Sequence, residues 1–184
     1  MLRDYRSPDM KKVTIHSDGA CDGNPGPGGW AAVLEYGPRK KEICGSVMAT
    51  TNNRMEMQAA IEALQLLKEA CEVQFYTDSE YLREGITSWV RIWKRTGWRT
   101  KERKPVKNAD LWRMLDELAS QHEVTWHWLK GHAGHVLNER CDTLAVEAIH
   151  NLRRQHKQED FVRALAGFRA EQAEARNPTP QLPF

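Results

Sequence analysis

Residues 16–30 read HSDGACDGNPGPGGW, and this stretch lies between two segments with strand-like apolar patterns. The segment at its start, residues 13–17, has the alternating pattern of a strand, and the segment at its end, residues 30–36, also has a strand-like pattern. A strand is therefore predicted to end at about Asp18, and a glycine- and proline-rich turn is predicted to follow it over residues 19–29. A third strand is predicted over residues 43–48, after the polar turn GPRKK. The chain is expected to open with a three-stranded meander.

The remainder of the chain alternates helical and strand patterns. In chain order these predict a helix over about 52–69, a strand over 73–77, a helix opening at 79, a helix over about 108–120, a strand over 124–129 and a helix over about 136–152. This order predicts an α/β layer architecture. A further apolar stripe at helical spacing, formed by Phe161, Leu165 and Phe168, precedes the tail NPTPQLPF, whose prolines end any helix.

Length and composition favour one compact domain with some extra length. The 184 residues are 40% hydrophobic and 28% charged, which is enough apolar material for a core. The longest apolar runs are far shorter than the roughly 20 residues that cross a bilayer, and the N-terminus lacks the apolar centre of a secretory signal. The four cysteines do not have zinc-site spacing. A cytoplasmic protein without a membrane span is expected, in which Cys141 packs in a helix.

Positive charge is concentrated between Trp89 and Lys107. This segment holds eight Lys and Arg residues against one carboxylate, a formal charge of +7, so the rest of a chain of net charge +2 carries −5. Such a patch indicates a polyanionic partner. Its tryptophans, Trp89, Trp93 and Trp98, can pack on nucleic-acid sugars or bases. Alternatively, Trp89 and Trp93, four residues apart, form an apolar helix seam and the cations are merely solvated.

Four carboxylates lie far apart in the chain, each within a distinctive short sequence. They are Asp18 in HSDGACDGNPGPGGW, Glu56 in TTNNRMEMQAA, Asp78 in FYTDSEY and Asp142 in KGHAGHVLNERCD. Acids at strand ends and on helix faces can converge in an α/β fold. A cluster of carboxylates is the ligand set that Mg²⁺ takes. The predicted chemistry is metal-assisted attack on a phosphate.

Each of these acids also has an ordinary structural interpretation. Asp18 could begin an Asp-Gly turn. Glu56, three residues after Asn53, could complete a capping box. Asp78 could cap the helix that follows its strand, and Asp142 could lie on the solvated face of its helix. The ordered set of four favours metal binding over these alternatives.

Residues 11–149 closely resemble the catalytic domain of bacterial type I ribonuclease H. The resemblance rests on DGACDGNPGPGGW, TTNNRMEM, TDSEY, PVKNADLW and KGHAGHVLNERCD, which occur in this order. It implies a ribonuclease H-like α/β fold with a mixed five-stranded sheet flanked by helices. It also implies a catalytic domain over residues 11–150, between an N-terminal extension at 1–10 and a charged helical extension with a tail at 151–184.

The resemblance further implies an endonuclease that hydrolyses the RNA strand of RNA/DNA hybrids. Two Mg²⁺ ions, for which Mn²⁺ is a possible substitute, would serve the attacking water and the leaving 3′ oxygen. The products would carry 5′-phosphate and 3′-hydroxyl ends. His132, between the glycines of KGHAGH, would assist proton transfer or product release. The expected metal ligands are Asp18, Glu56, Asp78 and Asp142.

Substrate contacts are implied in the same way. Tyr81 and Trp89 would lie against deoxyribose of the DNA strand. Thr51 and Asn108 would hold one of its phosphates. Amides that both donate and accept hydrogen bonds suit recognition of the RNA 2′-hydroxyl, although asparagines are also common in turns and caps. The full set of expected substrate-binding residues is Cys21, Asn24, Thr51, Asn52, Asn53, Tyr81, Trp89 and Asn108.

The chain departs from the family pattern at two positions and extends beyond it at the end. Ala49 stands where relatives often place an arginine in the DNA-phosphate pocket, and Glu80 stands where a neutral amide is common, so a weaker grip on the DNA strand is expected. Residues 151–184 favour a charged helix packed on the body, followed by a frayed tail. The terminal QLPF is similar to short peptides that dock onto replication proteins, which is a further hypothesis. The protein is otherwise expected to be a monomer.

Two rival functions stay open on the sequence. A non-catalytic hybrid-binding module would keep the fold and the basic patch, although the complete set of four acids argues against it. A related metal nuclease that acts on DNA ends or junctions would share the acids but not the asparagines and the tryptophan-rich segment. Equal cleavage of DNA/DNA and RNA/DNA duplexes would favour this second rival.

Overall fold

The structure, a computed structural model, describes residues 10–131 and 133–177. Its centre is a five-stranded sheet in the order β3-β2-β1-β4-β5. The first three strands pair antiparallel, while β4 and β5 run parallel to β1. The predicted mixed five-stranded α/β fold is confirmed. The strands are β1 (Lys11–Cys21), β2 (Gly26–Tyr36), β3 (Arg39–Thr50), β4 (Cys71–Thr77) and β5 (Glu123–Trp128).

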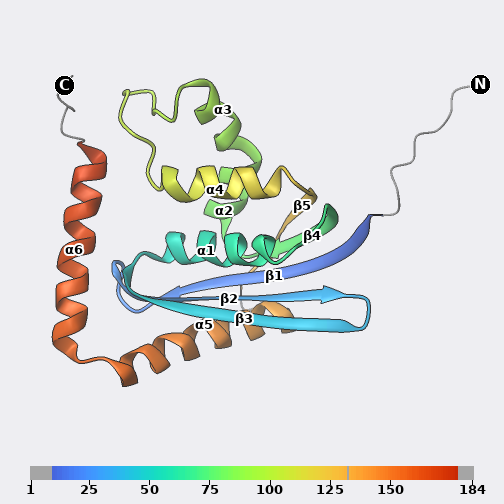
Figure 1. Cartoon of the computed structure of the whole chain (residues 1–184), viewed down its shortest axis with the longest axis horizontal. Coiled ribbons are helices and arrows are strands. Elements are labelled where there is room, and N and C mark those ends of the chain that lie inside the picture. Colours follow the sequence, from blue (N-terminus) through green and yellow to red (C-terminus); the bar gives the residue numbers. More distant parts are fainter. Residues whose placement is uncertain (1–9, 132, 178–184) are drawn as a thin grey trace, which may run out of the picture.

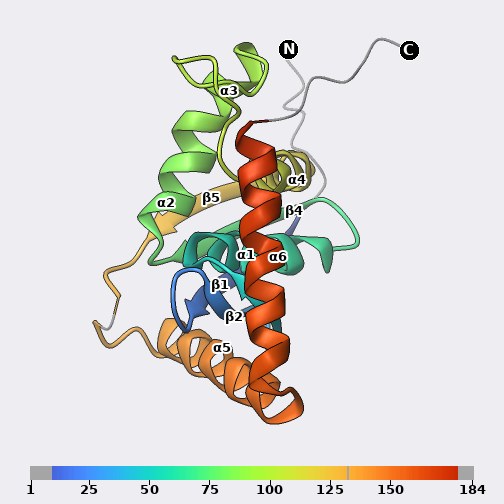
Figure 2. The same ribbon diagram turned by 90° about the vertical axis from the view of Figure 1, so that its left-hand side faces the viewer.

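Helices cover both faces of the sheet, as Figure 1 shows. One face carries α1, on which α4 packs, and the opposite face carries α5. After β4 the chain forms α2, a short π-helix η1 and α3 in immediate succession. The last helix, α6, stands upright beside the end of the sheet (Figure 2). The bounds are α1 (Asn52–Gln65), α2 (Glu80–Glu84), η1 (Gly85–Trp89), α3 (Val90–Arg95), α4 (Ala109–Ala119), α5 (Val136–Gln155) and α6 (Gln158–Arg176).

The main hydrophobic core lies between the sheet and the layer of α1 and α4. Alternate residues of β4 are buried, which is the period of two of a strand with one face on the core. By contrast, β2 is buried over most of its length because α1 packs on one side of it and α5 on the other. Of the helices in the described ranges, none is long and apolar enough to cross a membrane.

A smaller core joins α5 to the first two strands. Cys141 is fully buried there together with Ala31, Val33 and Ala145. Its thiol donates a hydrogen bond to the carbonyl oxygen of His16 at 3.3 Å, and burial raises the pKa of Cys141 to about 12. The predicted packing role of this cysteine is confirmed.

The first two strands are longer than the sequence predicts. β1 continues to Cys21 and β2 begins at Gly26, so only residues 22–25 connect them. Glycine weakens strands, which is why the sequence indicates a turn, but strand glycines also mark close approach of another backbone. A Cβ atom at Gly29 would lie 2.1 Å from the carbonyl oxygen of Ala145 on α5. The expectation of a turn over residues 19–29 was wrong, because these glycines lie mostly within strands, where Gly29 allows α5 to pack closely on β2.

The first helix is shorter than predicted. It ends at Gln65, not near Glu69. The amides of Leu66 and Leu67 donate to carbonyl oxygens three residues earlier, at 3.3 and 3.1 Å. Such bonds tighten the last turn of a helix and end it.

The C-terminal region begins within α5, which continues through residue 150 without a break in the helix. α5 runs to Gln155, and α6 begins three residues later. The start of α6 is anchored by Phe161, which is 6% exposed and lies 5.4 Å from the Arg153 guanidinium. α6 then packs on β3. The QLPF tail and residues 1–9 lie outside the described residues, so the contact predicted for the tail stays a prediction.

Replacing Gly29 with Ala is expected to lower the free energy of unfolding by about 3 kcal/mol, because the new methyl group forces α5 away from β2. The measurement is urea denaturation of both proteins. Gly167→Ala is the matched control, since nothing lies within 4 Å of a Cβ atom at this position on α6. It should gain about 0.5–1 kcal/mol from helix propensity. Equal effects of the two changes would contradict the packing argument.

Candidate active site

Asp18 and Asp78 lie side by side because their strands are parallel and in register. Ser17 of β1 pairs with Thr77 of β4, and each acid is the next residue along its chain. Asp18 is only 6% exposed, and its Oδ1 accepts a hydrogen bond from the amide of Gly19 at 2.8 Å. It lies within β1, so the alternative of an Asp-Gly turn is wrong.

Glu56 reaches the same place from α1. Glu56 is 5% exposed. A Cβ atom at Gly19 would lie 2.3 Å from the backbone nitrogen of Glu56, so the absence of a side chain at Gly19 lets α1 approach β1. The N-cap of α1 is Thr51, whose backbone is extended and whose carbonyl oxygen accepts from the Met55 amide at 3.1 Å. Glu56 is therefore not the third residue after the N-cap. The capping-box alternative, with Asn53 as the cap, is wrong.

These three carboxylates form one compact group. One oxygen from each of Asp18, Glu56 and Asp78 lies within 4.8 Å of the others. Asp142, on α5, lines the same hollow of about 460 Å³ but stands outside the compact group. Burial, and then the charge of Asp78, raises the pKa of Asp18 to about 8. Burial, and then the charge of Asp18, raises the pKa of Glu56 well above its ordinary value. The repulsion between these groups favours a bound cation.

Asp78 is held by a partner that the sequence analysis missed. Ser79 caps α2, since its Oγ accepts from the Leu82 amide at 3.2 Å, so the capping alternative for Asp78 is wrong. The Oδ2 atom of Asp78 accepts a hydrogen bond from Asn138 Nδ2 at 3.1 Å. Asn138 is buried on α5. It stands four residues before Asp142 and thus on the same helix face, which is the signal that could have identified it.

The expected asparagines gather where the β1–β2 turn meets the start of α1. Asn52 and Asn53 line the hollow of the acids. Asn24 ties the turn to the helix, because its Oδ1 accepts from the Asn52 amide at 3.2 Å. Asn52 Nδ2 also donates to Glu56 Oε1 at 3.4 Å. The neutral amides therefore lie directly beside the acids.

Cys21 lies at the end of β1, near these asparagines. Its Sγ is 3.5 Å from each of the carbonyl oxygens of Gly26 and Thr50, to which the thiol donates. In the structure it links the first three strands, and it is not among the residues that line the acid hollow. Its expected substrate contact stays a prediction.

Tyr81 also lines the acid hollow, and two neighbouring side chains hold its hydroxyl. Its hydroxyl accepts hydrogen bonds from Asn108 Nδ2 at 3.1 Å and from Trp112 Nε1 at 3.3 Å. The Trp89 ring meets the Tyr81 ring edge-on at 5.7 Å, and both residues are half-buried. The structure thus joins three of the expected substrate-binding residues into one connected group.

Comparison with known proteins agrees with this geometry. The family model for RNase H matches residues 10–150. The chain belongs to the ribonuclease H family. The ribonuclease H of Chelativorans sp. is 62% identical over 136 residues, which cover 74% of this chain and 84% of that protein. The ribonuclease HI of Caulobacter vibrioides is 59% identical over 138 residues, covering 75% and 93%.

Solved structures of the ribonuclease H family share the fold. LC9-RNase H1, described as a type 1 RNase H with the type 2 active-site motif, is 30% identical and superposes with a TM-score of 0.72. The match covers 95% of this chain and 90% of that one. It therefore extends beyond the residues that the family model matches, into the C-terminal region.

The tryptophans of the basic segment divide between the site and the core. The Trp93 ring lies 5.8 Å from Trp89 and 5.8 Å from Trp112, and Trp98 follows at 6.3 Å from Trp93. Trp93 and Trp98 pack against the main core. The neighbouring Trp89 and Trp93 rings fit the apolar seam, whereas contact of Trp89 with a nucleic acid stays a prediction. The neighbouring cations are mostly exposed, and Lys94 forms an ion pair of 2.7 Å with an acid of α4.

Arg54 is a second residue that the sequence analysis missed. Its guanidinium donates to Asn108 Oδ1 at 3.3 Å and to both oxygens of Asp110 at 3.1 and 2.7 Å. It therefore sets the orientation of the buried Asn108 side-chain amide. Asn108 occupies the N-cap position of α4 in the left-handed region, at φ 58°, and its side chain makes no capping hydrogen bond. The place of Arg54 in the TTNNRMEM motif is the sequence signal. Ala49 and Glu80, where the sequence analysis expects departures from the family pattern, line different hollows. Ala49 lines a hollow that Arg54 also lines, and Glu80 lines the acid hollow.

The glycine-rich loop before α5 reaches the acids. A Cβ atom at Gly131 would lie 2.9 Å from Asp78 Oδ2, so the loop passes directly beside this carboxylate. His132 lies outside the described residues, and its expected role stays a prediction. On the far side of the loop, His135 occupies the N-cap position of α5.

Proposed function

We propose that this protein is a Mg²⁺-dependent endoribonuclease that hydrolyses the RNA strand of RNA/DNA hybrids and leaves 5′-phosphate and 3′-hydroxyl ends. The observation that carries the proposal is the compact group of Asp18, Glu56 and Asp78 in a chain with ribonuclease H relatives. The catalytic domain would span residues 11–150. We further propose that the protein acts as a monomer in the cytoplasm.

The donor set of the site fits a hard divalent cation. Mg²⁺ and Mn²⁺ prefer carboxylate oxygens, and Glu56 Oε2 is a buried oxygen without a hydrogen-bond partner among the described residues. Asp18, Glu56 and Asp78, with Asp142 from the lining of the same hollow, would hold two ions. When bound there, the ions would lower the pKa of the attacking water and stabilise charge on the leaving oxygen.

The protein groups around the acids would position them and the scissile phosphate. The Gly19 amide and the Asn138 amide each hold one carboxylate oxygen, so Asp18 and Asp78 keep fixed orientations before substrate arrives. His132 follows Gly131 in the loop that passes Asp78. We propose that it assists proton transfer or product release.

Substrate recognition would use the neutral and aromatic residues around the acid hollow. Asn52 and Asn53, with Asn24 behind them, offer donors and acceptors to the 2′-hydroxyl that distinguishes RNA from DNA. The aromatic faces of Tyr81 and Trp89 suit packing against sugars of the DNA strand. The full set of proposed substrate contacts is Cys21, Asn24, Thr51, Asn52, Asn53, Tyr81, Trp89 and Asn108.

The proposal is tested with a hybrid whose RNA strand is end-labelled. We expect cleavage with Mg²⁺, loss of cleavage on addition of a chelator, and a rate at least about 10³-fold lower for Asp78→Asn, since most of the charge stabilisation at the scissile phosphate is lost. The matched control is Asp116→Asn, which removes an acid of α4 outside the acid hollow.

Two outcomes would overturn the proposal in different ways. Tight binding of the hybrid without any cleavage would identify a binding module. Cleavage of DNA/DNA as fast as RNA/DNA would identify a nuclease that does not read the 2′-hydroxyl.

A further inference from the structure

A second hollow lies between α6 and the residues that carry the expected substrate contacts. Its volume is about 410 Å³. One side is formed by Asn24, Thr51 and Asn53, from the β1–β2 turn and the start of α1. Figures 1 and 2 both show α6 rising past this end of the sheet toward the level of α4. The helix therefore forms the outer wall of a hollow whose inner wall is polar.

The lining of this hollow is positively charged. Lys107, at the end of the basic segment, faces Arg169 and Arg176 of α6 across it, and none of the described residues that line it is an acid. All three cations are exposed. Within the described parts of the chain, none of them forms an ion pair with a carboxylate. Three unneutralised cations around one concave site favour an anion.

The inner wall offers polar groups to the same ligand. Thr51 Oγ1 has no hydrogen-bond partner among the described residues, and a hydroxyl can donate to an anionic oxygen. Thr51 is the N-cap of α1, and Asn53 lies in the first turn of this helix. Cations together with neutral donors around one hollow are what a phosphate group binds to.

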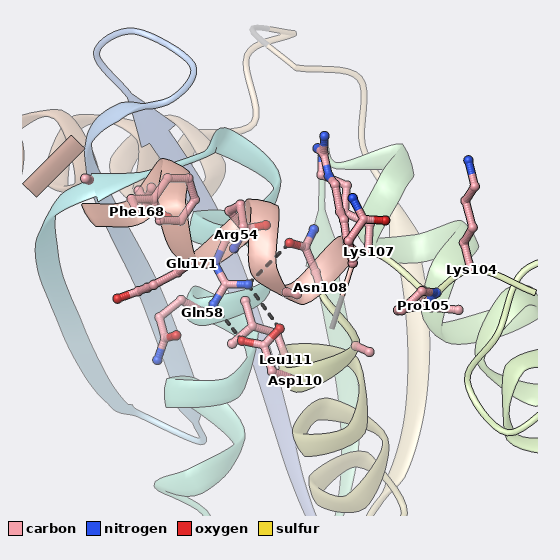
Figure 3. A pocket seen from close by; sticks show the side chains of 18 of the residues that line it. Arg54, Gln58, Lys104, Pro105, Lys107, Asn108, Asp110, Leu111, Phe168 and Glu171 are labelled. Carbon is pink, nitrogen blue, oxygen red and sulfur yellow. Dashed lines mark hydrogen bonds and ion pairs between the residues drawn. The ribbon is translucent and has the colours of Figure 1, made fainter. Parts of the chain in front are cut away.

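A larger hollow of about 960 Å³ adjoins this one and differs in charge (Figure 3). Four residues line both hollows, namely Lys107, Phe168, Gln172 and Arg176. In the larger one, however, the Arg54 guanidinium is already engaged by Asp110, and Glu171 of α6 adds a further carboxylate. The smaller hollow is therefore the one that suits an anion.

The smaller hollow neighbours the hollow of the acid cluster, with which it shares a lining residue. Asn53 lines both of them. A nucleic-acid strand with one phosphate at the carboxylates would therefore place a neighbouring part of the duplex backbone beside α6. Free phosphate shares the chemistry of a backbone phosphate, but only a polynucleotide would reach both hollows at once.

We propose that α6 is part of the nucleic-acid-binding surface, where Arg169 and Arg176, together with Lys107, bind a backbone phosphate of the duplex. This inference rests on the proposed function, because the duplex is taken to be the RNA/DNA hybrid at the acid cluster. Arginine suits the role because its planar guanidinium donates two parallel hydrogen bonds to phosphate oxygens. Each contact releases counterions from the duplex and so makes binding depend on salt.

The test compares the full chain with its Arg169→Gln/Arg176→Gln variant. Both carry Asp78→Asn so that the hybrid stays intact, and fluorescence anisotropy gives the dissociation constant over a series of KCl concentrations. We expect the double variant to bind roughly tenfold more weakly at low salt, with a slope of log K against log salt that is smaller by about 2. The matched control is Arg163→Gln, also on α6, which is 78% exposed, pairs with Asp160 and lines neither hollow. It should change the slope much less.

Inorganic phosphate provides a second arm. Phosphate is added at constant ionic strength. It should weaken hybrid binding more for the protein that keeps both arginines than for the double variant. An unchanged dissociation constant and slope in the double variant would overturn the inference. Tighter hybrid binding would also overturn it, because α6 would then occlude the duplex. A third result would also overturn it. If the arginine substitutions changed the binding of free phosphate but not of the hybrid, the hollow would be a small-anion site.

The inference and the proposed function fail separately. If the protein without Asp78→Asn cleaves the hybrid but the arginine pair leaves binding unchanged, only the role of α6 falls. If it does not cleave the hybrid but the pair changes the salt slope, only the proposed function falls.

Discussion

Asp18→Asn is expected to reduce hybrid cleavage at least about 10³-fold and, at the same time, to make the metal-free protein more stable. The loss of activity follows from removing one of the three carboxylates that lie within 4.8 Å of one another. The gain in stability follows from the cost of burying that charge beside Asp78. A catalytic defect and a stability gain from one substitution would identify a site where function opposes stability.

The pH dependence of this gain has a definite sign. Burial and the neighbouring acids raise the pKa of Asp18 to about 8 from its ordinary value of 3.8. Stability from the neutral carboxyl is therefore fully present below pH 3.8 and is lost as the pH rises through about 8. At pH 9 the Asn variant should be more stable by about 3 kcal/mol, less than the whole shift implies, because water in the hollow screens part of the repulsion around the ionised carboxylate. The difference should shrink as the pH falls toward 4.

Chemical denaturation between pH 4 and 9, with chelator present, measures this difference. Asp116→Asn again serves as the control, because this acid lies outside the acid hollow. Added Mg²⁺ should stabilise the unmodified protein more than the Asp18→Asn variant, since a ligand that binds only the folded state stabilises it by mass action. A variant that is less stable than the unmodified protein at pH 9 would contradict the charge-repulsion argument.

Trp112→Ala is expected to lower the free energy of unfolding by about 3–5 kcal/mol. Trp112 is fully buried, and its ring lies 5.3 Å from Tyr81 and 5.8 Å from Trp93. A Cβ atom at Gly85 would lie 2.0 Å from the indole, which shows how closely the π-helix packs on it. Loss of the indole would leave a cavity at the junction of α4 with the segment that carries the aromatic site residues. Urea denaturation measures the effect.

The same substitution should also weaken hybrid binding, because the Trp112 indole donates to the Tyr81 hydroxyl at 3.3 Å. Trp112→Phe separates the two effects. It keeps most of the packing and loses the hydrogen bond, so it should cost about 1–2 kcal/mol. A Trp112→Ala protein within 1 kcal/mol of the unmodified chain would show that the core around Tyr81 tolerates a cavity there.

Several features of the fold could be predicted because their signals are local. The alternation of β4, the serine that begins α2 and the helical spacing of α5 each depend on residues a few positions apart. The glycine-rich stretch after Asp18 could not be interpreted in this way. Whether a glycine such as Gly29 ends a strand or admits a helix depends on Ala145, which is more than a hundred residues away.

The candidate site shows the same division. Its acids could be selected from their motifs, whereas the residues that hold them could not. Asn138 supports Asp78 across 60 residues, and Arg54 supports Asn108 across 54, through hydrogen bonds that no local pattern predicts. Likewise, Trp93 and Trp89 stand in the same basic segment, yet only packing separates a core ring from one beside the acid hollow.

Residue order therefore sets which helices and strands form and which acids are available, since each depends on near neighbours in the chain. Packing sets the rest. Strand register brings Asp18 and Asp78 together, and close approach of α1 adds Glu56, while Asp142 lines the same hollow outside this compact group. The high pKa of Asp18 and the position of α6 across the polar hollow also arise only on folding. Both depend on distances between remote segments, and those distances exist only once the sheet and helices have packed.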